Sequence, residues 1–156
     1  MKKSGFKVPY SLENIDQKGL GIIATDDIKK GTLIWKPLYI KRYNEQTFNK
    51  LIVHMELSTT IESIRFFLNH IYGWNGFIIE LLDDSKYMNH SSNANSGAGD
   101  KLGIFDPFGC NYALRDINAG EEITDDYSAY DNPSWYLELC KVYNVESAKD
   151  CAKKYI

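Results

Sequence analysis

Three short stretches of the chain carry residue types that can bind a ligand or take part in a reaction. The first is YMNHSSNANSG, Tyr87–Gly97, where three asparagines, three serines and one histidine follow the apolar run GFIIELL. Amide, hydroxyl and imidazole groups can hold a polar ligand, but they also form ordinary Asx turns. By spacing alone, Asn89, His90 and Ser91 are more typical of such a turn.

The second stretch is the G-x-G of Gly19-Leu20-Gly21. Glycines allow backbone amides and carbonyls to approach a ligand that a Cβ atom would hold off. No third glycine follows at dinucleotide spacing, and a predicted strand rather than a helix comes next, so a Rossmann site is not indicated. A tight turn is the more usual role of such a pair.

The third stretch is GEEITDDY, Gly120–Tyr127, which follows a predicted turn. Its acidic residues are typical of a solvated strand edge. Tyr127 is compatible with a tyrosine that packs by its ring and keeps its hydroxyl in water. None of the three stretches identifies a reaction alone.

The composition limits the classes of function. The chain has 156 residues, of which 44% are hydrophobic and 25% charged, as is typical of one globular domain. Its formal net charge of −3 offers no basic field for phosphates, so no nucleic-acid partner is expected and a basic protein partner suits it better. No apolar run reaches about 18 residues, so no membrane span is expected.

The cysteines indicate the compartment. Cys110, Cys140 and Cys151 are odd in number, widely spaced and without a C-x-x-C pair. This pattern favours a reduced, intracellular protein without a structural zinc or other metal site. The N-terminal stretch also lacks the apolar core of a secretion signal.

The strands that must position these motifs are predicted from short runs of β-branched and aromatic residues. The first two runs are expected to pair as a hairpin through the turn DDIKKG. Asn75-Gly76 signals a tight turn before the third run. The expected strands are 20–25, 32–40, 77–82, 101–109 and 110–117.

Helical spacing of apolar residues occurs in three segments. Two of them are 44–57, with Asn44 as its N-cap, and 58–71. A third helix is expected after Pro133, which suits a first helical turn. Its expected apolar face is formed by Trp135, Leu139 and Val142. With the short strands, these helices predict an irregular fold that is mainly β with short helices.

Taken together, the three motifs resemble those of the SET-domain protein lysine methyltransferases. That family begins with a G-x-G before a strand and continues with N-H-S-C-x-P-N. It ends with A-x-R-D-I-x-x-G-E-E-[IL]-T-x-D-Y, and Ala113–Tyr127 reads ALRDINAGEEITDDY. The residues that match the first two motifs are Gly19, Gly21, Asn89, His90, Ser91 and Asn95.

The resemblance covers roughly Gly5–Tyr127 and implies a fold and a domain division. The implied fold consists of small curved β-sheets around a C-terminal pseudoknot, where the N-H-S and D-Y stretches meet. The SET domain would span 1–130, with a variable insert at about 44–86 that helps to shape the peptide groove. A C-terminal helical segment without zinc cysteines would span 131–156.

The resemblance also implies a cofactor, S-adenosylmethionine, and a lysine-containing protein as substrate. The G-x-G backbone and the Asn89 side chain would bind the methionine end of the cofactor, and the backbone at His90 would bind the adenine. Tyr127 would be catalytic, and Asp125 and Tyr127 would line the substrate channel. The implied cofactor-binding residues are Lys18, Gly19, Leu20, Gly21, Asn89, His90, Tyr127 and Trp135.

Three departures from the family pattern affect the prediction. Ser92 and Ala94 replace a cysteine and a proline in the loop, which concerns rigidity more than chemistry. Asp125 stands where the family commonly has Phe or Tyr, so the number of methyl groups added is not predicted. In place of zinc cysteines, Trp135 or Tyr136 is expected to cover the adenine, unless Trp135 only anchors its helix to the core.

Two classes of function therefore stay open. One is an active methyltransferase acting on a histone or another basic protein. The other is a catalytically silent SET-like module that binds a peptide or the cofactor. The intact Tyr127 and Asn89 favour the enzyme.

Overall fold

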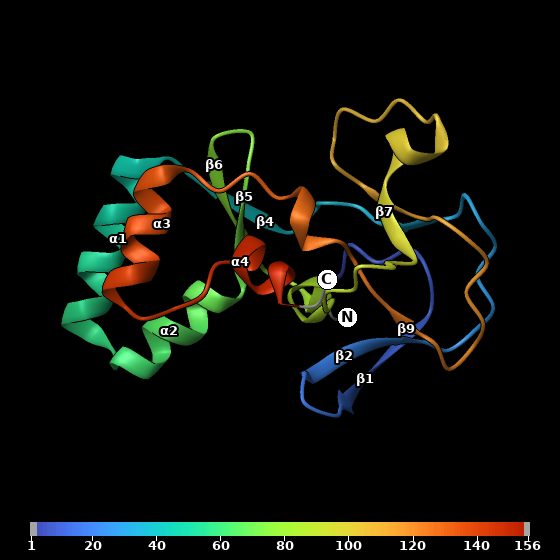
Figure 1. Cartoon of the computed structure of the whole chain (residues 1–156), viewed down its shortest axis with the longest axis horizontal. Helices are drawn as coiled ribbons and strands as arrows, with labels where there is room; N and C mark the ends of the chain where they lie inside the picture. The colour runs from blue at the N-terminus through green and yellow to red at the C-terminus, as the bar shows by residue number, and fades with distance from the viewer. Residues whose placement is uncertain (1–2, 155–156) are drawn as a thin grey trace. The chain divides into compact units, whose positions relative to one another are not determined.

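The computed structural model describes residues 3–154 and divides them into two compact units. Unit 1 is the described part of Met1–Tyr39 together with Leu82–Asp126. Unit 2 is Ile40–Leu81 together with the described part of Tyr127–Ile156. Figure 1 shows the elements of both units coloured along the chain. Within residues 3–154, no helix has the length and apolar character needed to cross a membrane.

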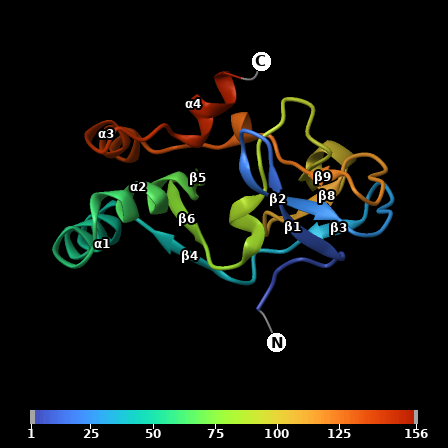
Figure 2. The same ribbon diagram turned by 90° about the horizontal axis from the view of Figure 1, so that it is seen from below.

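Unit 1 contains two three-stranded antiparallel sheets (Figure 2). The first has the order β1-β2-β9 and the second the order β3-β8-β7. Ile22, Ile23 and Ala24 of β2 are buried and form the centre of the first sheet. The strands are β1 (Tyr10–Ile15), β2 (Gly19–Ala24), β3 (Leu33–Trp35), β7 (Ser96–Ala98), β8 (Asn111–Ala113) and β9 (Glu122–Ile123), with the short helices η1 (Asp84–Tyr87) and η2 (Gly99–Leu102).

The predicted hairpin between 20–25 and 32–40 is wrong. β2 pairs instead with β1 and β9, and β3 pairs with β8. Segment 32–40 is interrupted at Pro37, which has no amide hydrogen to donate to a sheet. β1 was not predicted, because its sequence YSLENI contains polar residues in place of a continuous run of β-branched and aromatic residues.

The predicted strand at 101–109 is also absent. This segment holds the end of η2 and then a loop organised by Asp106. The Asp106 carboxylate accepts hydrogen bonds from the amides of Phe108 (2.8 Å) and Cys110 (3.1 Å) and from the Tyr112 hydroxyl (3.1 Å). Aspartate closing a turn on its own backbone competes with strand formation.

A buried carboxylate fixes the segment that leads into the Asn89 loop. Asp83 is 4% exposed and accepts hydrogen bonds from the Gly5 amide (2.6 Å), the Trp35 indole (3.2 Å) and the Ser85 amide (3.0 Å). A Cβ atom at Gly5 would lie 2.2 Å from the Lys36 carbonyl, so only glycine fits. η1 is thereby held against the N-terminal segment, directly before the loop.

Unit 2 combines one antiparallel sheet, in the order β4-β6-β5, with four α-helices and the short helix η3. Asn44 caps the first helix by accepting a hydrogen bond from the Thr47 amide (2.9 Å), as predicted. Asn75 and Gly76 both have positive φ, at 51° and 79°, and make the predicted tight turn. The elements are β4 (Ile40–Tyr43), α1 (Glu45–Ser58), α2 (Ile61–Asn69), β5 (Ile71–Trp74), β6 (Phe77–Leu81), η3 (Tyr127–Ala129), α3 (Ser134–Val142) and α4 (Ala148–Lys153).

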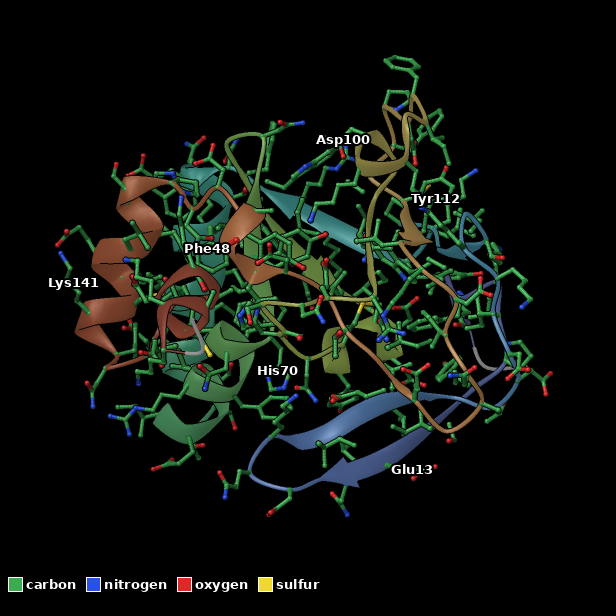
Figure 3. All side chains as sticks on the ribbon, turned by 45° about the vertical axis from the view of Figure 1, so that its right-hand side comes forward. Glu13, Phe48, His70, Asp100, Tyr112 and Lys141 are labelled. Carbon is green, nitrogen blue, oxygen red and sulfur yellow. The ribbon has the colours of Figure 1, made fainter. Side chains whose placement is uncertain are left out.

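The core of unit 2 is aromatic. Phe48 of α1 is fully buried, and its ring lies 5.7 Å from Tyr43, 5.6 Å from Trp135 and 6.0 Å from Tyr136, measured between centroids. Figure 3 shows Phe48 among the helices and Lys141 directed away from them. These packed rings hold α1 and α3 together.

The predicted apolar face of α3 needs correction. Tyr136, Cys140 and Tyr143 are the buried residues, whereas Val142 is 76% exposed. Trp135 and Leu139 lie at the partly buried edge of this core. Positions 135, 139 and 142 have the same helical spacing as 136, 140 and 143, so periodicity alone does not select between the two faces.

Candidate functional site

The Asn89 loop and the strand of the third motif meet in unit 1. The Asp125 amide donates to the Asn89 carbonyl (3.0 Å), and the Ser91 amide donates to the Asp125 carbonyl (3.0 Å). His90 therefore forms a parallel bridge with Asp125. The N-H-S stretch and the start of D-D-Y lie side by side, as the pseudoknot requires.

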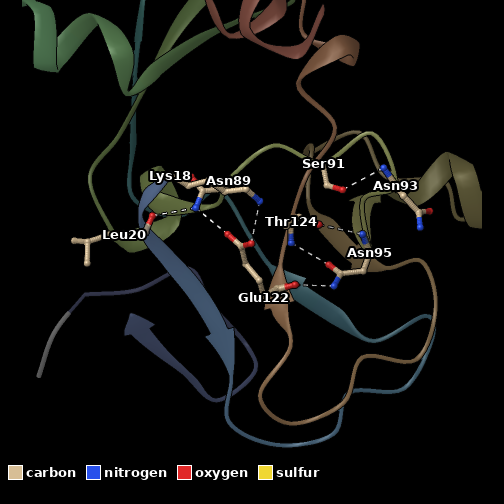
Figure 4. A network of polar contacts seen from close by, with 8 residues as sticks. All are labelled: Lys18, Leu20, Asn89, Ser91, Asn93, Asn95, Glu122 and Thr124. Carbon is tan, nitrogen blue, oxygen red and sulfur yellow. Dashed lines mark hydrogen bonds and ion pairs between the residues drawn. The ribbon is translucent and has the colours of Figure 1, made fainter. Parts of the chain in front are cut away.

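The far end of the same loop is held by Asn95, which is 2% exposed. Its Nδ2 donates to the Glu122 carbonyl (2.8 Å), and its Oδ1 accepts from the Thr124 amide (2.9 Å). The Ser96 hydroxyl donates to the Thr124 carbonyl (2.8 Å). Both ends of the 89–96 loop thus form hydrogen bonds with residues 122–125, and β2 pairs with β9 beside them (Figure 4).

Asn89 links all three motifs within unit 1. Its Nδ2 donates to the Leu20 carbonyl (3.1 Å) and to Glu122 Oε1 (2.8 Å). Lys18 Nζ forms an ion pair with Glu122 Oε2 (3.2 Å), and Figure 4 shows these groups converging. Because both amide hydrogens are engaged, Asn89 Oδ1 is the part of the side chain that remains to accept a hydrogen bond from a ligand.

Gly21 is required by this arrangement. A Cβ atom there would lie 2.6 Å from Ile15 Cγ1, 2.8 Å from Glu122 Oε1 and 3.1 Å from Asn89 Nδ2. Gly19 has a different role: its φ of +79° ends the β1–β2 turn, and a Cβ atom there would meet nothing within 4 Å. The G-x-G therefore combines a turn glycine with a glycine that makes room for polar groups.

The two adjacent glutamates of the third motif have separate roles. Glu121 accepts a hydrogen bond from the Asn118 amide and forms an ion pair with Arg115 (3.1 Å). The Asn118 amide, with Arg115 adding to it, lowers the pKa of Glu121, so the turn loses this stabilisation as the pH falls through that lowered pKa. Glu122 instead holds Asn89 and Lys18.

Glu122 is the site residue that was missing from the prediction. Its acidic neighbourhood indicated a solvated edge, yet its side chain is only 16% exposed. The alternation of side chains along a strand could have identified it. Glu122 pairs with Ile23, and Gly21 lies two residues before Ile23 on β2, so Glu122 and Gly21 lie on the same face of the sheet.

The remaining predicted site residues are divided between the units. In unit 1, Asp125 is partly buried, and its Oδ1 accepts a hydrogen bond from the Asp126 amide (2.8 Å). In unit 2, Tyr127 begins η3, and its ring stacks on Tyr130 with centroids 5.4 Å apart. Trp135 is partly buried against Phe48. In the described part of the chain, no group of three or more His, Cys, Asp or Glu side chains is arranged to hold a metal ion.

Comparison with known proteins supports this architecture. The family model of the SET domain matches residues 19–128, which include all three motifs. One similar solved structure is the Neurospora SET domain protein DIM-5, a histone lysine methyltransferase, with a TM-score of 0.53 and 17% sequence identity. The likeness covers 79% of this chain and 53% of that one, so the chain spans about half the length of DIM-5. At this identity it concerns the fold alone, and it confirms the expected fold class. Among curated proteins there is no match.

Proposed function

Because the chain belongs to the SET-domain family, we propose that it transfers a methyl group from S-adenosylmethionine to the side-chain amine of a lysine in a protein. The observation that carries this proposal is the convergence of Lys18, the G-x-G strand, Asn89 and Glu122 in unit 1. We propose that the SET domain spans 1–130, with a variable insert at about 44–86, and that 131–156 is a C-terminal segment. A histone or another basic protein is the proposed substrate class, in an intracellular setting.

The residues present fit the methionine end of this cofactor. That end carries an ammonium and a carboxylate, and the site offers the Asn89 Oδ1 acceptor, backbone groups at 19–21 and the Lys18 cation. Because Gly21 has no Cβ atom, the Asn89 amide and Glu122 can lie close to its backbone. The backbone at His90 is proposed to bind the adenine. When bound, S-adenosylmethionine supplies an electrophilic methyl group on a sulfonium sulfur, which takes the electrons of the broken C–S bond.

The protein's contribution to the chemistry is to orient the amine and to keep it neutral. A lysine ammonium has a pKa of about 10.4 in water and no lone pair with which to attack. A water-poor channel beside a cation favours the neutral amine, and its proton leaves to solvent. Tyr127 is proposed to place its hydroxyl at the reaction centre and to orient rather than abstract a proton. Positioning of this kind provides effective molarities from about 10⁵ M.

Glu122→Gln is expected to weaken cofactor binding by about 0.5–1.5 kcal/mol, roughly two- to tenfold in Kd. The substitution keeps the size of the side chain but removes the charge that holds Lys18 and accepts from Asn89. Calorimetric titration with S-adenosylmethionine measures the change. Glu62→Gln is a matched control, because Glu62 is exposed in the first turn of α2 and belongs to unit 2. An unchanged Kd for Glu122→Gln would show that Glu122 does not contribute to cofactor binding.

Trp135→Ala tests the proposed adenine cover. We expect a loss of about 1 kcal/mol, roughly fivefold in Kd, because stacking of a base on an aromatic ring is favourable. Tyr136 is not suited to this role: it is 1% exposed, and its hydroxyl donates to the Leu68 carbonyl (2.9 Å). Leu139→Ala, at the same edge of the core, controls for lost packing. If both variants lose thermal stability equally and neither changes the Kd, Trp135 is only an anchor.

The alternative function is a binding module without turnover. Asp125, at a position where the family commonly has an aromatic residue, is the feature that favours it. Calorimetry and a methyl-transfer assay on the same preparation distinguish the two functions. The enzyme both binds S-adenosylmethionine and methylates protein lysines, whereas the module binds and does not methylate.

A further inference from the structure

We propose that Tyr130 and Tyr72 are positioning residues that hold the Tyr127 ring in its working orientation. The inference rests on the proposed function, since it concerns the residue assigned to the reaction centre. It adds to that function a link between Tyr127 and β5 of the insert. All the contacts that carry it lie within unit 2.

The three rings form a continuous stack with Tyr130 in the middle. The Tyr72 and Tyr130 centroids are 4.4 Å apart with an interplanar angle of 21°. The Tyr130 and Tyr127 centroids are 5.4 Å apart with an angle of 24°. Such near-parallel aromatic pairs are favourable beyond the apolar area that they bury. Tyr127 and Tyr130 are also joined through the backbone, because the Tyr130 amide donates to the Tyr127 carbonyl (3.2 Å).

The end of the stack formed by Tyr72 and Tyr130 is fixed by backbone hydrogen bonds of the residues that follow these two tyrosines. The Asp131 amide donates to the Gly73 carbonyl (3.2 Å), and the Gly73 amide donates to Asn132 Oδ1 (2.8 Å). A Cβ atom at Gly73 would lie 2.2 Å from the Asp131 carbonyl oxygen, so this approach requires glycine. Tyr72 precedes Gly73 and Tyr130 precedes Asp131, so the pairing sets the two rings in register.

The stack of tyrosine rings is expected to affect the rate of methyl transfer. The Tyr127 ring can adopt fewer orientations because the fixed Tyr130 ring packs against one of its faces. A displacement of about 1 Å at a reacting group can lower a reaction rate about 10²-fold. Removing the middle ring therefore affects kcat. It is expected to leave the cofactor affinity nearly unchanged, because Asn89, Lys18 and Glu122, which are proposed to bind the methionine end, are held by bonds to Leu20 and to one another.

The experiment compares Tyr130→Ala with Tyr130→Phe in the full chain. Tyr130→Ala is expected to lower kcat at least about tenfold with an unchanged Kd for S-adenosylmethionine, whereas Tyr130→Phe keeps the ring and stays near the wild-type kcat. Val142→Ala, at an exposed position of the same unit, is the control. Tyr72→Leu, at the other end of the stack, is expected to change kcat in the same direction and replaces Tyr130→Ala if that variant does not fold.

A second readout is independent of activity. Nitration of Tyr127 by tetranitromethane, followed by peptide mass spectrometry, is expected to be faster in Tyr130→Ala than in wild type, because one face of the ring is uncovered. Unchanged nitration together with unchanged kcat would overturn the positioning role, and so would an equal loss of kcat in Tyr130→Phe. If the wild-type chain transfers no methyl group, the proposed function fails, while nitration still decides whether Tyr130 holds Tyr127.

Discussion

Tyr127→Phe is expected to lower kcat for lysine methylation by about 10²–10³, the cost of removing one preorganised polar group from a reaction centre. The substitution deletes only the hydroxyl and keeps the ring that stacks on Tyr130. Fold and cofactor affinity are therefore expected to stay close to wild type. This combination distinguishes a role in the reaction from a role in packing.

Steady-state kinetics and calorimetry on the same preparations measure this effect. Tyr39→Phe is a matched control, because Tyr39 is partly buried in unit 1 and lies outside the three motifs. Wild-type turnover in Tyr127→Phe would remove Tyr127 from the reaction centre. A loss of thermal stability equal to the loss of activity would assign it to packing instead.

Asn89→Ala is expected to weaken S-adenosylmethionine binding by about 2–3 kcal/mol, roughly 30- to 150-fold in Kd. The variant loses the Oδ1 acceptor proposed to contact the cofactor. It also leaves the Leu20 carbonyl and Glu122 Oε1 without their shared donor. A charged acceptor without its partner is the more costly of these two changes.

The matched control for Asn89→Ala is Asn93→Ala in the same loop. Asn93 is exposed, and its backbone amide rather than its side chain donates to the Ser91 hydroxyl (3.2 Å; Figure 4). Calorimetric titration is expected to show a wild-type Kd for Asn93→Ala and a greatly raised Kd for Asn89→Ala. Equal affinities in both variants would contradict the assignment of Asn89 to the cofactor site.

Elements specified by neighbouring residues were predictable from the sequence. The Asn44 cap, the helical spacing of α1 and α2 and the Asn75-Gly76 turn act within a few residues, and all three are confirmed. Strand pairing was not predictable, because β2 selects β9 about one hundred residues later in the chain. That choice depends on the whole sheet rather than on local propensity.

The sequence motifs identified residues of the candidate site, but they did not predict the contacts between these residues. The motifs named Gly21 and Asn89, but only the structure shows why Gly21 has no room for a side chain. Glu122 was hidden among acidic residues, since charge alone does not show which carboxylate turns toward an amide. Tyr130 lay outside every motif, and its role depends on pairing with Gly73, which no local pattern indicates.

An assay of methyl transfer itself decides whether this chain methylates lysine in proteins. The full chain is incubated with S-adenosylmethionine labelled in its methyl group and with a mixture of histones and other basic proteins, beside Tyr127→Phe. Mass spectrometry then locates any added methyl group. We expect label on lysine side chains with wild type and about 10²–10³ times less with Tyr127→Phe. No label from a wild-type chain that binds the cofactor in calorimetry would contradict this expectation.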